Sequence, residues 1–233
     1  MKKRLAMVID TRRCVGCMDC VIACQTENNV PEGFHRDWIA TVTEGRFPKL
    51  RTEIRSERCH HCDRPPCVTV CPTGASYKND DGVVLVDPAL CTGCKACVAA
   101  CPYFARFTNP AGYADKCTFC THRTSRGDLP ACVSVCPTEC LHFGDIADPE
   151  SEVRRLIETN EYKRLRPELG TEPQLYFLVH GGTRGWLDTP DDFASTGSGA
   201  AAATTTAPAP PPAPAAKPAG EKKGDAAFED SGC

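Results

Sequence analysis

The sequence predicts an α+β fold in which cysteine motifs hold two interleaved units together, followed by a disordered tail rich in alanine and proline. Three observations support this prediction. The chain of 233 residues contains 18 cysteines, and sixteen of them form four motifs of four. Short apolar runs of strand length lie next to these motifs. From about residue 193 the chain is mostly alanine, proline and threonine, which cannot bury enough apolar surface to become ordered.

Composition and charge limit the classes of function. Only 7% of the residues are aromatic, so we expect a small apolar core that the cysteines must supplement. The net charge of −3 gives no overall field that would attract nucleic acid or an anionic membrane, and we expect no nucleic-acid partner. A membrane-spanning helix needs about 20 mostly apolar residues. The apolar runs here are as short as Val83–Val86, so we expect no direct membrane insertion.

Four motifs carry the sixteen cysteines. The first (Cys14, Cys17, Cys20, Cys24) and the third (Cys91, Cys94, Cys97, Cys101) have the spacing C-x2-C-x2-C-x3-C. The second (Cys59, Cys62, Cys67, Cys71) has C-x2-C-x4-C-x3-C, and the fourth (Cys117, Cys120, Cys132, Cys136) has C-x2-C-x11-C-x3-C. Proline follows the last cysteine of the second, third and fourth motifs. The run C-x2-C-x2-C-x3-C-P is the bacterial ferredoxin signature, so we predict four [4Fe–4S] clusters as cofactors.

The spacing also predicts how each motif works. Three cysteines on a tight loop bind one cluster, and the fourth, on the first turn of the following helix, reaches a second cluster. The proline then stops the helix. Disulfides do not need this spacing. Zinc would suit the second or fourth motif alone, and zinc or a [3Fe–4S] cluster in one site stays open. Reactive thiols cannot account for sixteen cysteines.

Residues 59–108 resemble a whole bacterial two-cluster ferredoxin, so the second and third motifs are expected to exchange their last cysteines. Motifs one and four then remain for each other. The expected ligand sets are as follows: cluster 1, Cys14, Cys17, Cys20 and Cys136; cluster 2, Cys117, Cys120, Cys132 and Cys24; cluster 3, Cys59, Cys62, Cys67 and Cys101; cluster 4, Cys91, Cys94, Cys97 and Cys71.

Secondary structure is predicted around these motifs. Leu5–Asp10 is an opening strand, and residues 25–58 contain Trp38-Ile39, which favours a strand or a packed loop. The turn sequence Asn79-Asp80-Asp81-Gly82 predicts a hairpin that joins Gly74–Tyr77 to Val83–Val86.

The second half of the chain continues the pattern. Short strands are predicted over Phe104–Phe107, Leu141–Gly144 and Leu175–Val179. Apolar residues recur at helical spacing within 149–169, which predicts a short helix there. The predicted division is an outer dicluster unit (1–58 plus 109–148), an inner dicluster unit (59–108), a C-terminal extension that packs on the core (149–192) and the disordered tail (193–233).

Other residues near the motifs have simpler predicted roles. Arg58, Lys95 and Lys116 each adjoin a ligand cysteine; solvated surface charges are the favoured interpretation, and cations that raise a cluster potential are the alternative. His60 and His61 lie between two ligands, where a structural role is favoured over Rieske-type ligation. Two cysteines remain outside the motifs: Cys140 is expected to be a buried free thiol, and Cys233 to have no structural role.

Residues 5–180 also resemble a known family. The motifs that carry the resemblance are Met7-Val8-Ile9-Asp10 before Cys14-Val15-Gly16-Cys17, Thr26-Glu27-Asn28, Cys71-Pro72-Thr73-Gly74-Ala75-Ser76-Tyr77, Asn109-Pro110-Ala111-Gly112-Tyr113, Lys116-Cys117-Thr118-Phe119-Cys120-Thr121-His122-Arg123 and Pro130-Ala131-Cys132. They resemble the iron–sulfur electron-transfer subunit (the beta polypeptide) of dimethyl-sulfoxide-reductase-type molybdoenzymes, above all that of the polysulfide/thiosulfate reductases. Two features depart from the family pattern: the long tail, and Gln25 in place of a proline after the first motif.

The resemblance implies a non-catalytic subunit that relays electrons through four [4Fe–4S] clusters. The implied partners are a molybdopterin-containing catalytic subunit and a polytopic, quinone-reactive membrane subunit, in the respiration of sulfur compounds. The chain would be a peripheral subunit of a membrane-associated complex, either at the periplasmic face after co-export or at the cytoplasmic face. The alternative is a soluble polyferredoxin, or an electron-transfer module of a hydrogenase or formate dehydrogenase. A diffusible carrier should have a more charged surface than a net charge of −3 provides.

Overall fold

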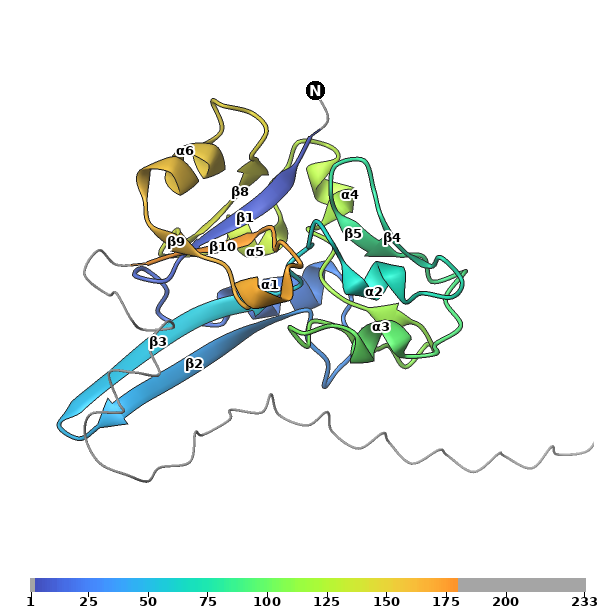
Figure 1. Cartoon of the computed structure of the whole chain (residues 1–233), viewed down its shortest axis with the longest axis horizontal. Coiled ribbons are helices and arrows are strands. Elements are labelled where there is room, and N and C mark those ends of the chain that lie inside the picture. The colour runs from blue at the N-terminus through green and yellow to red at the C-terminus, as the bar shows by residue number, and fades with distance from the viewer. Residues whose placement is uncertain (1–2, 180–233) are drawn as a thin grey trace, which may run out of the picture.

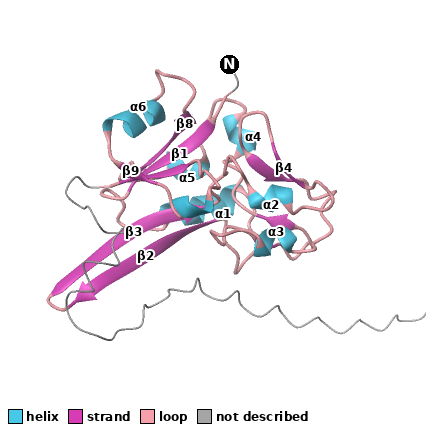
Figure 2. Ribbon diagram, viewed as in Figure 1, coloured by secondary structure: helices cyan, strands magenta, loops and turns pink. Residues whose placement is uncertain are grey.

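A four-stranded sheet joins distant parts of the chain (Figures 1 and 2). β1 (Leu5–Asp10) lies antiparallel to β8 (Leu141–Asp145) and parallel to β10 (Leu175–Leu178), and β9 (Tyr162–Lys163) pairs with β10 at the edge. The strands predicted over 5–10, 141–144 and 175–179 are therefore confirmed. The structure is a computed structural model that describes residues 3–179, so the predicted tail and Cys233 lie outside the described residues.

Both faces of this sheet are covered, because successive side chains of a strand point to opposite faces. On one face, Met7 and Ile9 of β1 pack into the core that contains the cysteines. On the other face, Ala6 and Val8 pack with Val153 of α6 (Glu152–Thr159), the helix predicted within 149–169. The Ser151 side chain caps α6 by accepting a hydrogen bond from the backbone of Arg154. The sheet thus forms one wall of the cysteine-rich body.

Short helices hold the motifs on the other side of the sheet. They are α1 (Asp19–Glu27), α2 (Pro66–Thr69), α3 (Ala96–Ala99), α4 (Thr121–Thr124) and α5 (Ala131–Ser134). In every motif the third cysteine is the second residue of a helix, and in the last three motifs the fourth cysteine comes two residues after the helix ends. The prediction that the fourth cysteine lies on the first turn of the helix is therefore wrong. Because x3 spans about one helical turn, the helix separates the third cysteine from the fourth.

Two small hairpins follow the second and third motifs. β4 (Ser76–Lys78) and β5 (Val84–Val86) form the predicted hairpin, and the Gly82 N–H donates to the Asn79 carbonyl at 3.1 Å. β6 (Phe107–Thr108) and β7 (Ala114–Asp115) form the other. The strand predicted over Phe104–Phe107 is wrong for most of its length, because Phe104 has a φ of 54°, which a strand cannot accommodate.

A long hairpin projects from the body (Figure 1). It consists of β2 (Asp37–Arg46) and β3 (Lys49–Arg58), in the region where a strand or packed loop was predicted. Its base is buried and leads directly into Cys59, whereas Phe47 near its tip is 88% exposed. A short 3-10 helix (Pro167–Leu169) precedes β10. No helix within residues 3–179 has the length and apolar character needed to cross a membrane.

Candidate metal centres

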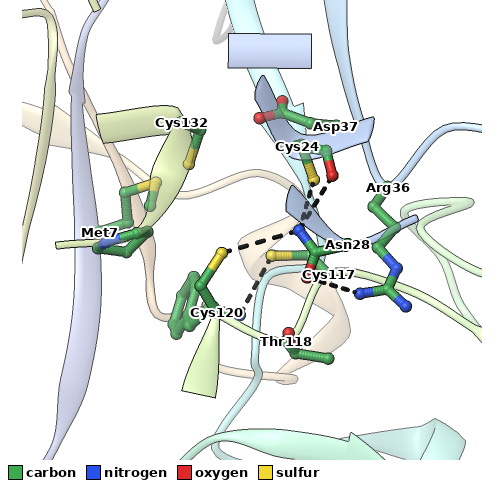
Figure 3. A pocket seen from close by; sticks show the side chains of 11 residues that line it. Met7, Cys24, Asn28, Arg36, Asp37, Cys117, Thr118, Cys120 and Cys132 are labelled. Atoms are coloured by element: carbon green, nitrogen blue, oxygen red, sulfur yellow. Dashed lines mark hydrogen bonds between the residues drawn. The ribbon is translucent and has the colours of Figure 1, made fainter. Parts of the chain in front are cut away.

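Three cavities are each lined by four cysteines, three from one motif and one from another. We name each after the cysteine that crosses over: the Cys101 cavity has Cys59, Cys62, Cys67 and Cys101; the Cys71 cavity has Cys71, Cys91, Cys94 and Cys97; the Cys24 cavity has Cys24, Cys117, Cys120 and Cys132. Figure 3 shows the Cys24 cavity, where the labelled cysteines from separate segments surround one space. The packing of α2 on α3, and of α1 on α5, brings these motifs together.

A fourth group of thiols joins the first and last motifs. Cys140 Sγ lies 3.5 Å from Cys136 Sγ, and the Cys140 N–H donates to the same sulfur at 3.4 Å. A hydrogen bond from Cys140 also lowers the pKa of Cys14 to about 6. Cys20 of this motif lies 3.4 Å from the hydroxyl of Ser56. Cys140 is 3% exposed and is a free thiol, as predicted.

The donor sets fit multi-iron clusters better than disulfides or single zinc ions. All seventeen cysteines in the described part of the chain are free thiols. Tetrahedral zinc with Zn–S bonds of about 2.3 Å would need sulfurs roughly 3.8 Å apart around one point. Within residues 3–179, no three cysteine, histidine or acidic side chains converge in this way. Four thiols that surround a space instead match a cluster with several irons.

Burial makes most of the thiols in the Cys101 and Cys24 cavities hard to ionise. Burial, with a smaller contribution from nearby thiols such as Cys59, raises the pKa of Cys62 and of Cys117 to about 12. Since iron binds the thiolate, loading these sites must release protons. Iron, or positive charges beside the sulfurs, would stabilise the thiolate form of these buried cysteines.

The loops of the four motifs share one backbone conformation. In each C-x2-C segment the residue before the second cysteine has a positive φ: 70° at Gly16, 43° at His61, 69° at Gly93 and 53° at Phe119. Glycine adopts this conformation without strain, whereas other residues are strained in it. The two rings at the strained positions stack, with His61 and Phe119 centroids 3.7 Å apart. This stack joins the second motif to the fourth.

The two histidines have structural roles. Both are fully buried, and burial lowers the pKa of His60 to about 3 and that of His61 well below its ordinary value. His61 Nδ1 accepts a hydrogen bond from the Val84 N–H at 3.1 Å, and the His60 ring stacks on Tyr103 at 3.9 Å. Neutral, packed rings agree with the structural role that the sequence predicted for them.

Hydrogen-bond donors surround the sulfurs. The Asn28 amide donates to Cys24 Sγ at 3.6 Å and to Cys120 Sγ at 3.8 Å, and Arg36 holds its carbonyl oxygen at 3.0 Å (Figure 3). The backbone N–H groups of Ser76 and Ala114 donate to other ligand sulfurs at 3.3 and 3.4 Å. Such bonds stabilise the more negative, reduced state of a cluster. The sequence placed Asn28 in a family motif but gave no sign of this contact.

Two cations beside the cysteines are buried, contrary to the favoured prediction of surface charges. Arg58 is fully buried; its Nη1 lies 2.9 Å from Cys132 Sγ, and its Nη2 lies 3.0 Å from Asp37 Oδ2. Lys116 is 1% exposed, and its Nζ donates to the carbonyls of Val84 and Cys117. Only Lys95 is exposed as predicted. A position next to a ligand cysteine therefore does not decide whether a charged side chain is exposed. The direction in which the local backbone points that side chain decides it.

Arg106 is a third buried cation, and the sequence reasoning missed it. It is 5% exposed, and its Nη2 donates to Cys67 Sγ at 3.0 Å and to Ser76 Oγ at 2.8 Å. It lies five residues beyond Cys101 and belongs to none of the quoted motifs, so no local pattern marks it. Tertiary folding alone brings it to the Cys101 cavity.

Comparisons with known proteins agree with this geometry. Two family models, both described as a 4Fe-4S dicluster domain, match residues 13–75 and 50–146. The B polypeptide of polysulfide reductase from Wolinella succinogenes is 42% identical over 182 residues, which cover 76% of this chain and 95% of that protein. The chain belongs to the family of this polysulfide reductase polypeptide. The resemblance predicted from the motifs and the predicted class of fold are thereby confirmed.

Other relatives carry related names. The thiosulfate reductase electron transfer subunit PhsB of Salmonella typhi is 43% identical, over 76% of this chain and 93% of that protein. The B polypeptide of tetrathionate reductase from Salmonella typhimurium is also 43% identical, over 76% of this chain and 73% of that protein. The two domain matches cover overlapping stretches of this polysulfide-reductase family member, whereas its Cys24 cavity combines cysteines from the first and fourth motifs.

Proposed function

We propose that this chain is a non-catalytic electron-transfer subunit that relays electrons through four [4Fe–4S] clusters. The observation that carries the proposal is the set of three cavities, each lined by four cysteines drawn from two motifs. A [4Fe–4S] cluster exchanges one electron at a time. The protein residues supply the thiolates, exclude water from most of them and donate hydrogen bonds to sulfur.

The proposed ligand sets are those expected from the sequence. The cavities support three of them, namely Cys117, Cys120, Cys132 and Cys24; Cys59, Cys62, Cys67 and Cys101; and Cys91, Cys94, Cys97 and Cys71. The contacts of Cys140 with Cys14 and Cys136 support the fourth, Cys14, Cys17, Cys20 and Cys136. On this basis we also propose the division into an outer unit (1–58 plus 109–148) and an inner unit (59–108).

The helices give these sites a physical connection. Cys67 lies in α2 and Cys71 follows its end, yet the two thiols line different cavities. A single helical turn therefore separates two sites, and the stacked rings of His61 and Phe119 join the inner unit to the outer one. Short, packed connections of this kind suit a relay of single electrons.

The proposed partners follow from the names of the relatives. Subunits of polysulfide, thiosulfate and tetrathionate reductases are 42–43% identical to this chain. We propose that the chain connects a molybdopterin-containing catalytic subunit to a polytopic, quinone-reactive membrane subunit, in the metabolism of sulfur compounds. It would be a peripheral subunit on one face of that membrane.

The first experiment counts iron in the full chain, purified without oxygen. Four clusters of four require about 16 iron atoms per chain, with broad absorbance near about 400 nm. A value below about 12 would contradict the four-cluster proposal. Isolation of the native chain from membranes should then recover molybdenum and a membrane subunit with it. Recovery of the chain alone from the soluble fraction would favour a free polyferredoxin.

A further inference from the structure

The Cys24 cavity and the Cys101 cavity differ in whether a carboxylate pairs with the buried cation beside their sulfurs. At the Cys24 cavity, Arg58 contacts Cys132 but also pairs with Asp37, whose carboxylate is fully buried beside it. Asp37 also acts on Cys24 and Cys132, where it opposes the effect of Arg58. Asp37 therefore offsets Arg58 at this cavity, and Lys116, which also acts on Cys117, is the further cation beside it.

At the Cys101 cavity, no carboxylate of the described residues plays this part. Arg106 contacts Cys67 and also interacts with Cys97 of the Cys71 cavity, and its buried Nε and Nη1 have no hydrogen-bond partner within residues 3–179. Lys116 donates only to carbonyls, one of them from Val84, which lines this cavity. Among the described side chains, neither cation forms an ion pair with a carboxylate. Arg106 and Lys116 both act on Cys67, and Arg106 also acts on Cys101, whereas the charged groups that act on Cys62 are other thiols.

Lys116 reaches this cavity from the other unit. It precedes Cys117, the first cysteine of the fourth motif, yet it interacts with Cys59 and Cys67 as well as with Cys117. Arg58 mirrors it, because it precedes Cys59 and contacts Cys132 of the fourth motif. Taking a cation out of water costs several kcal/mol unless an anion compensates it. For Lys116 and Arg106, the compensating negative charge is that of the thiolate ligands together with the cluster that they are proposed to bind.

We propose that Lys116 and Arg106 make the midpoint potential of the site held by Cys59, Cys62, Cys67 and Cys101 more positive than that of the neighbouring site held by Cys24, Cys117, Cys120 and Cys132. This inference rests on the proposed function. In the transfer between the two sites one electron leaves one and enters the other, with no bond made or broken and no proton moved. The uncompensated cations stabilise the added negative charge, so an electron is held at the Cys101 site between transfers.

The test is a redox titration of the full chain, followed by electron paramagnetic resonance. The signal that Cys62→Ser removes identifies the Cys101 site, and the signal that Cys120→Ser removes identifies the Cys24 site. In the unchanged protein the Cys101 site should be reduced at the higher potential. Lys116→Gln keeps a hydrogen-bond donor but removes the charge, so it should lower the potential of the Cys101 site most and narrow the gap. Lys116→Arg should restore the gap.

Lys95→Gln is the matched control, because Lys95 also adjoins a ligand cysteine but is exposed to water, which screens its charge. Because Lys95 lines the Cys71 cavity, the change should leave the potentials of the Cys101 and Cys24 sites where they are. The inference is overturned if the Cys24 site has the higher potential, or if Lys116→Gln shifts no potential more than Lys95→Gln does. If Lys116→Gln loses iron, Arg106→Gln provides the same test. An iron count near about 16 with the wrong order of potentials would refute this inference alone, whereas a low count would refute the proposed function.

Discussion

At the scale of single residues, the net charge beside a sulfur depends on whether the nearby cation forms an ion pair, and not on which residue adjoins the cysteine in the sequence. Arg58 and Lys116 occupy equivalent places before the second and fourth motifs, and both are buried. Arg58 is held by Asp37, which lies 21 positions earlier at the start of β2, whereas Lys116 is held by two carbonyls. The same local pattern therefore leads to two different electrostatic environments.

Asp37→Asn tests this pairing. The change removes a buried negative charge but keeps a side chain of the same shape, so Arg58 acts uncompensated on Cys132. At an effective dielectric constant of about 20, a unit charge roughly 6 Å away contributes about 3 kcal/mol, which for one electron is on the order of 100 mV. The midpoint potential of the Cys24 site should rise by up to this amount in a redox titration. An unchanged or lower potential would show that the Asp37 charge does not reach the site.

At the scale of elements, the motif loops depend on one residue in the left-handed conformation. Two loops use glycine there, and the other two use His61 and Phe119, whose rings stack. Gly93 is under a second constraint, because an added Cβ would lie 2.5 Å from the Gly112 carbonyl oxygen. Gly74 also has a positive φ, of 71°, but has nothing within 4 Å of an added Cβ.

These two glycines form a matched pair of substitutions. Gly74→Ala should reduce stability only by the strain of its backbone conformation, about 1 kcal/mol. Gly93→Ala adds a collision with backbone, which must displace the loop that bears Cys91 and Cys94. We expect Gly93→Ala to lose one cluster, about four iron atoms per chain, in an iron assay, while Gly74→Ala keeps all of them. Equal iron contents in the two variants would contradict the role assigned to this close approach.

At the scale of the whole molecule, the first and fourth motifs are separated by about a hundred residues, yet their thiols meet around Cys140. β1 and β8 explain the meeting. β1 leads into the first motif, β8 follows the fourth, and the two strands are paired from Leu5 with Asp145 to Ile9 with Leu141. β10 then pairs with the other edge of β1, so the last described strand is hydrogen-bonded to the first.

This arrangement predicts which cysteines act together. Cys136→Ser and Cys17→Ser should each remove the same signal from the electron paramagnetic resonance spectrum of the reduced chain, whereas Cys120→Ser should remove a different one. Because Cys140 Sγ lies 3.5 Å from Cys136 Sγ, the serine variant is best combined with Cys140→Ala, so that Cys140 cannot replace the missing ligand. If Cys136→Ser instead gave the spectrum of Cys120→Ser, the interleaved pairing would be wrong.

The cysteine motifs were enough to predict iron–sulfur chemistry from the sequence. The spacing of sixteen cysteines indicated multi-iron sites, and strands such as Leu5–Asp10 followed from local apolar runs. Sequence spacing is sufficient for these features because a tight loop and a following helical turn place thiols almost independently of the rest of the chain. The prediction of a strand over Phe104–Phe107 was wrong because Phe104 adopts a positive φ, which nothing in the local sequence indicates.

Tertiary structure alone decided the electrostatic environment of the sites. Asp37 pairs with Arg58, Arg106 contacts Cys67, and Lys116 donates to the Val84 carbonyl. Each of these contacts joins residues at least 20 positions apart, so no pattern along the chain records them. Whether a charge beside a cysteine faces water or the core depends on the packing of the long hairpin and the two interleaved motif pairs. The cysteine motifs are therefore a local property of the sequence, whereas the charges that surround each group of thiols are a property of the fold.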